Sequence, residues 1–76
     1  MIESLVLIEG ERVSEGALEG VSLMNAKQLV VGSTPRNSVV LHVAANSATD
    51  FGSALLEFAA VPGVTDVLTL AIQSAR

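Results

Sequence analysis

The fold is decided by residues 47–64, which read Ser47-Ala48-Thr49-Asp50, then an apolar ladder, and then Val61-Pro62-Gly63-Val64. Ser47 is a favourable helix N-cap, and Asp50, three residues later, can reach back to it as in a capping box. Pro62-Gly63 predicts the end of this helix. The apolar positions between these signals recur at helical spacing and predict one buried helix face: Phe51, Ala54, Leu55, Phe58 and Ala59.

Strand-like segments lie on both sides of this helix. Residues 38–45 precede it and residues 64–72 follow it, and both are rich in aliphatic and β-branched side chains. Two further strands are predicted at residues 2–8 and 27–31. Residues 32–37 contain Gly, Ser, Thr, Pro and Asn, so they predict a turn that joins two strands into a hairpin.

A first helix is predicted at residues 12–24. Gly16 and Gly20 lie inside it, and each costs a helix about 1 kcal/mol relative to alanine. If this helix forms, packing against a sheet must hold it. Its apolar face would consist of Val13, Ala17, Val21 and Met24.

The resulting order is β-α-β-β-α-β. This order predicts an α+β, ferredoxin-like sandwich in which a four-stranded antiparallel sheet carries two helices on one face. Right-handed crossovers place the first and third strands at the centre. We expect residues 1–76 to form one domain of this kind.

The composition predicts a surplus of apolar surface. Half of the 76 residues are apolar, but only two are aromatic, so the core must be aliphatic. A domain of this size buries only about 60% of the surface that its unfolded chain exposes. The surplus predicts a protein or peptide partner, or a second copy of the chain.

Charge and cysteine content restrict the partners. The net charge of −4 disfavours nucleic acid and anionic membranes. The absence of cysteine removes disulfides, thiolate catalysis and cysteine-based metal sites. The longest apolar run near the N-terminus, residues 5–8, is far shorter than the ~18 residues of a membrane span, so we expect a cytoplasmic protein without membrane insertion.

Alternation along the strands divides the sheet into two faces. We expect the larger aliphatic set of each strand to meet the helices, including Leu5 and Leu7 in the first strand. The other face would then lack lysine and carboxylates, whereas an uncovered antiparallel face is normally polar. The residues predicted on this open face, and predicted to bind a partner, are Val6, Ile8, Val40, His42, Val67 and Ala71.

No residue pattern indicates catalysis, a cofactor or a metal. His42 is the single histidine, and no acidic residue or cysteine on its strand could join it as a ligand, so a packed or interface histidine is the interpretation. No serine lies in a Gly-x-Ser-x-Gly elbow, and Gly32-Ser33-Thr34 does not continue as a phosphate-binding loop.

Glutamates are concentrated before and within the predicted first helix. Glu11, Glu15 and Glu19 are spaced by four residues and would share one helical face. A solvated acidic face is the plain interpretation. The functional one is that Glu11 and Glu15 steer a basic partner by complementary charge.

The chain resembles the family of small assembly chaperones of the periplasmic nitrate reductase. The resemblance rests on Ser4-Leu5-Val6-Leu7, on Glu11-Arg12-Val13-Ser14, on residues 39–43 and on Val61-Pro62-Gly63-Val64. Val61-Pro62-Gly63-Val64 and its surroundings also resemble ACT domains and the ligand-binding modules of Lrp/AsnC-type regulators.

Each resemblance implies a non-enzymatic function. The chaperone resemblance implies a ferredoxin-like, cytoplasmic protein that binds the twin-arginine signal peptide of a molybdoenzyme precursor. The ACT and Lrp/AsnC resemblance implies a regulatory dimer that binds a small molecule, such as an amino acid, between subunits. The sequence leaves both open.

Overall fold

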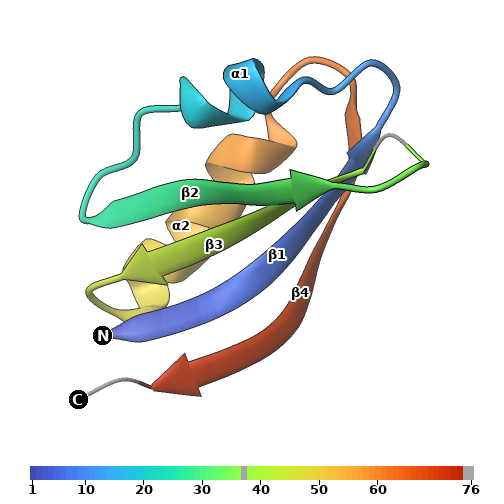
Figure 1. Ribbon diagram of the computed structural model, residues 1–76. Coiled ribbons are helices and arrows are strands. Elements are labelled where there is room, and N and C mark those ends of the chain that lie inside the picture. Colours follow the sequence, from blue (N-terminus) through green and yellow to red (C-terminus); the bar gives the residue numbers. More distant parts are fainter. Residues whose placement is uncertain (37, 75–76) are drawn as a thin grey trace.

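Six elements follow one another along the chain in the predicted order (Figure 1). The computed structural model describes residues 1–36 and 38–74, and of residues 71–74 only the backbone. The elements are β1 (Ile2–Gly10), α1 (Glu15–Glu19), β2 (Ala26–Ser33), β3 (Val39–Ala45), α2 (Ala48–Ala59) and β4 (Val64–Ser74). The predicted ferredoxin-like α+β fold is therefore confirmed.

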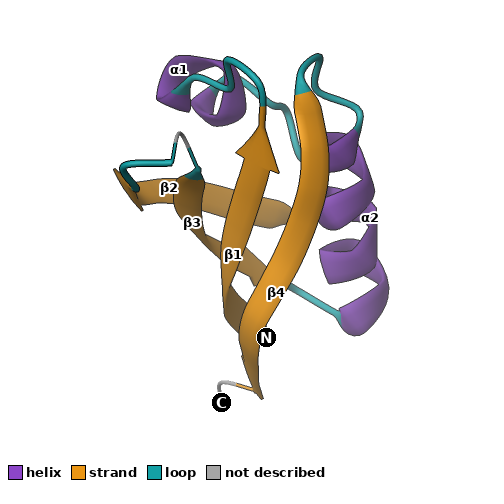
Figure 2. Ribbon diagram, turned by 90° about the vertical axis from the view of Figure 1, so that its right-hand side faces the viewer, coloured by secondary structure: helices purple, strands orange, loops and turns teal. Residues whose placement is uncertain are grey.

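The four strands form one antiparallel sheet in the order β2-β3-β1-β4. The first and third strands are central, as predicted. Figure 2 shows α2 against one side of this sheet, while the opposite side carries no helix. We call this uncovered side the open face.

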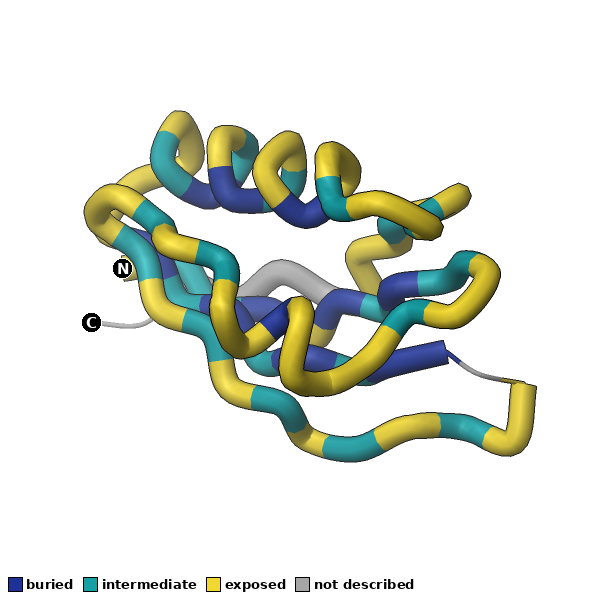
Figure 3. Tube along the Cα trace, turned by 90° about the horizontal axis from the view of Figure 1, so that it is seen from above, coloured by how far each residue is buried: buried dark blue, intermediate teal, exposed yellow. Residues whose placement is uncertain are grey.

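Helix α2 forms for the reasons its sequence gives. The Ser47 hydroxyl accepts a hydrogen bond from the Asp50 N–H at 3.1 Å and donates one to Asp50 Oδ2 at 3.0 Å, which completes the predicted cap. Phe51, Ala54 and Phe58 are buried, and Figure 3 shows the buried segments of α2 turned toward the sheet. The helix ends at Ala59, just before Pro62-Gly63.

The predicted first helix at residues 12–24 is wrong in extent, because α1 spans only five residues. Arg12 has a φ of 58°, which excludes it from a right-handed helix, and Ser14 caps the helix that follows. The helix stops at Gly20, and residues 21–25 have no regular structure. The predicted apolar stripe is therefore right only in part. Val13 and Val21 pack against the core, but Ala17 and Met24 are exposed, and Leu18 is the buried side chain of α1.

Gln28 joins this short helix to the sheet. The Gln28 side-chain amide donates hydrogen bonds to the carbonyls of Leu18 and Val21 at the end of α1. Gln28 is paired with Val43, a core residue, so α1 lies on the same side of the sheet as α2. Both helices are thus on one face, as predicted.

The predicted division of strand faces is right for β3 and wrong for β1 and β4. Val6 and Ile8, which we expected on the open face, are fully buried, and Val67 packs against the same core. Pairing explains the error, because Val6 lies opposite Leu41 and Val67 lies opposite Ile8. The core comprises Val6, Ile8, Leu18, Val39, Leu41, Val43, Ala45, Phe51, Ala54 and Phe58.

Candidate functional site

The open face is built from cross-strand rows of side chains. Residues that pair across neighbouring strands lie on the same side of a sheet, so the pairing assigns each row. The central row consists of Leu29, His42 and Leu5, from β2, β3 and β1. The next row toward the end of β1 consists of Val40, Leu7 and Leu68, from β3, β1 and β4.

Large apolar side chains in these rows are exposed to solvent. Leu29 is 65% exposed, Leu68 is 46% exposed and Leu5 is 41% exposed, while Leu7 and Val40 are half-buried. An antiparallel sheet with one covered face normally turns polar side chains to water on the other. The prediction of an apolar open face is therefore right for its middle rows, although their leucines come from the set that we expected inside. The predicted absence of lysine and carboxylates is wrong, because Lys27, Glu3, Glu9 and Asp66 are paired into rows of the same face.

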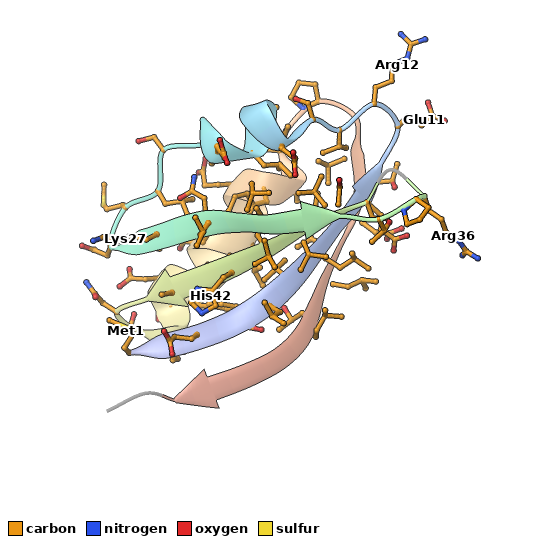
Figure 4. The ribbon with its side chains drawn as sticks, in the orientation of Figure 1. Met1, Glu11, Arg12, Lys27, Arg36 and His42 are labelled. Carbon is orange, nitrogen blue, oxygen red and sulfur yellow. The ribbon has the colours of Figure 1, made fainter. Side chains whose placement is uncertain are left out.

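Charged side chains lie at the two ends of the open face. At one end Lys27 is opposite Ala44, which is in turn opposite Glu3 (Figure 4 shows Lys27 on β2). At the other end Glu9 is directly opposite Asp66, and Glu9 follows Leu7 by two positions on the same strand. The apolar rows thus lie between a mixed-charge end and an end that carries two carboxylates.

His42 lies in the middle of this face with one acidic neighbour. Its Nε2 atom is 3.8 Å from Oε1 of Glu3, and both side chains are partly exposed. The two form an ion pair only when the imidazole is protonated. Across residues 1–36 and 38–74, no three acidic or histidine side chains come together in a way that could hold a metal ion.

The residues predicted to bind a partner do not all come together. Val40 and His42 lie on the open face, whereas Val6 and Ile8 lie in the core and Val67 packs against it. The side chain of Ala71 lies outside the described residues, although its backbone pairs with Leu5.

The predicted glutamate edge is also changed. Glu15 begins α1, but Glu11 lies outside the helix, before Arg12, so the two do not share a helical face. Figure 4 shows Glu11 and Arg12 at the end of the molecule away from Met1. Both glutamates are exposed, but the open face has its own carboxylates nearer the apolar rows.

Sequence reasoning missed Leu5, Leu7, Leu29 and Leu68, and the pair of Glu9 and Asp66. The available signal was the third strand, whose buried set of residues 39, 41, 43 and 45 was predicted correctly. The side chains paired with that set must be buried too. Pairing the first strand to it in the observed register would have placed Leu5 and Leu7 outside.

A hollow of about 380 Å³ lies beside the mixed-charge end of the open face. Its polar lining residues are Lys27, Asn25 and Asn46. The Asn46 N–H donates to the Asn25 carbonyl at 3.1 Å, which holds the two segments together. The other lining residues are Met1, Ala26, Ala44 and Ala45.

Comparison of the chain with protein-family models, with curated proteins and with solved structures finds no match. The ferredoxin-like assignment therefore rests on element order and sheet topology. Within the described part of the chain, no helix combines the length and hydropathy needed to cross a membrane.

Proposed function

We propose that this chain is a non-enzymatic binding module whose open face holds an apolar segment of a partner protein. The observation that carries the proposal is the exposure of Leu5, Leu29 and Leu68 in adjacent rows of a sheet face that no helix covers. Contiguous exposed apolar side chains of this kind mark interaction sites on soluble proteins.

The acidic end of the face favours a partner with basic residues next to its apolar segment. Glu9 and Asp66 are directly opposite each other, and like charges in this position destabilise a sheet. A lysine or arginine of the partner would relieve that repulsion while its apolar segment covers Leu7 and Leu68. The net charge of −4 acts in the same direction at longer range.

A twin-arginine signal peptide has this combination of basic and apolar residues. The resemblance to the assembly chaperones of periplasmic nitrate reductase supports it as the partner, and the protein would then act in the cytoplasm on a molybdoenzyme precursor before export. The open face with its observed residues suits this role better than the face predicted from the sequence, because its carboxylates border the apolar rows directly.

Calorimetric titration with a twin-arginine signal peptide tests this proposal. We expect heat of binding for the native chain and at least tenfold weaker binding for Leu29→Glu, since losing one buried leucine contact costs about 1.5–3 kcal/mol. Met24→Glu is the matched control, because this substitution adds the same charge at a side chain that is 82% exposed and lies near α2, away from the open face. Equal affinity of both variants, or no binding of several such peptides, would overturn the proposal.

The hollow beside Lys27 favours a second candidate, a regulatory dimer that binds a small molecule. Its polar lining residues suit the carboxylate of an amino acid. Two copies would then pack through their open faces, with Lys27 of one near Glu3 of the other. A thermal-shift screen of amino acids, with Lys27→Met as the control, tests this candidate.

A further inference from the structure

The outer edge of β4 is a second surface on which backbone groups are available for hydrogen bonding to a partner. In the order β2-β3-β1-β4, β4 lies at one edge, and among residues 1–36 and 38–74 it pairs with no strand other than β1. The backbone N–H and C=O groups on its other side therefore form a template on which another strand can pair. Residues Asp66–Thr69 are in continuous register with β1, between two register shifts, and so form the regular part of this edge.

The other edge of the sheet is protected, whereas this one is not. Strand β2 carries Lys27 and is bound to α1 through Gln28. On β4, from Val64 to Leu70, Asp66 is the single charged residue, and there is neither lysine nor proline. Lysine, proline and covering elements are the usual means of blocking an edge.

Exposed apolar surface flanks this edge on both sides. On the helix side, a groove of about 310 Å³ runs between α2 and β4, lined by Leu55, Leu56 and Ala59 and by residues 64–67. On the open side, Leu68 and Leu70 are exposed, the latter by 55%. Side chains of an added strand point alternately to the two sides, so both would meet apolar atoms.

We propose that the outer edge of β4 binds an extended segment of another protein as a fifth strand. The segment carries lysine or arginine opposite Asp66, because this carboxylate already faces that of Glu9. Apolar residues follow opposite Val67 and Leu68. A second copy of this chain fits less well, since it brings a further net charge of −4. This inference goes beyond the proposed function, because the partner pairs with the backbone at the sheet edge, although the two sites share Asp66 and Leu68.

Two end-capped seven-residue peptides test the edge directly. One peptide contains lysine, valine and leucine in this order, flanked by threonines, and the other contains the reverse order. One of them therefore suits a parallel added strand and the other an antiparallel one. We expect one peptide to bind and to slow amide hydrogen exchange within residues 66–69. N-methylation of two consecutive central residues of that peptide should weaken its binding at least tenfold. One of any two adjacent N–H groups must face β4, and methylation removes its hydrogen bond.

Variants of the protein separate this site from the open face. Asp66→Asn should weaken the affinity for the peptide severalfold. Glu57→Gln should leave this affinity unchanged, since Glu57 lies on the side of α2 near residues 22–24. Leu29→Glu should leave the peptide affinity unchanged, because Leu29 lies on the opposite edge strand. Unchanged affinity of the N-methylated peptide, or protection outside β4, would overturn the proposal. A peptide-free dimer protected at residues 66–69 would overturn it as well.

Discussion

Leu5 lies directly opposite His42 across the pair of β1 and β3, and both side chains are on the face that no helix covers. One position further along β1, Val6 lies opposite Leu41 in the core. A single step along one strand thus separates the interior of this protein from its candidate binding surface.

This separation predicts opposite costs for two truncations on β1. Ile8→Ala should lower the free energy of unfolding by about 2–5 kcal/mol, because the side chain is fully buried. Leu5→Ala should cost about 1 kcal/mol or less, because the side chain is 41% exposed. Urea unfolding followed by circular dichroism measures both values. A larger cost for Leu5→Ala than for Ile8→Ala would show that the two faces are reversed.

The pair of Glu9 and Asp66 predicts a stabilising substitution. Asp66→Asn should raise the free energy of unfolding by ~0.2–1 kcal/mol at low ionic strength, because it removes one of two like charges at directly opposite positions of the sheet. The gain should shrink in about 1 M salt, where the screening length falls to about 3 Å. A double-mutant cycle with Glu9→Gln isolates the repulsion, and a coupling energy of zero would contradict it.

Two glycines predict opposite effects of alanine. A Cβ atom at Gly10 would lie 2.0 Å from the carbonyl oxygen of Gly63, where the end of β1 meets the start of β4, so Gly10→Ala should destabilise the fold strongly. Gly52 lies inside α2 with nothing within 4 Å of such an atom. Gly52→Ala should therefore stabilise the chain by about 0.5–1 kcal/mol. Melting temperatures rank the two, and a loss of stability in Gly52→Ala would contradict the described helix.

The sequence predicted the parts of the fold that carry local signals. Helix α2 has the predicted cap at Ser47 and ends at Ala59, just before Pro62-Gly63. Its predicted apolar stripe is observed except at its end, since Leu55 is partly buried and Ala59 is exposed. The faces of β3 were also predicted, because Val39, Leu41 and Val43 form a larger aliphatic set than the residues that alternate with them. Ser38, which was grouped with His42, precedes β3 and is buried.

Signals of that kind were missing elsewhere. Both alternating sets of residues in β1 are mainly apolar. Alternation therefore divided the strand into two faces without showing which face meets the helices, and side-chain size was a poor criterion for choosing. The register with β3 determines which face of β1 is buried, and no local sequence pattern specifies that register. The length of α1 was overestimated, because the spacing of apolar residues does not reveal the left-handed backbone conformation of Arg12.

The most direct measurement of the central claim is a nuclear magnetic resonance titration of the methyl-labelled chain with a twin-arginine signal peptide. We expect the largest shifts at the methyl groups of Leu5, Leu7, Leu29 and Val40, with smaller ones at Ile8 and Leu18 inside the core. Binding that leaves those four residues unchanged, and shifts only methyl groups of the helices, would contradict that claim.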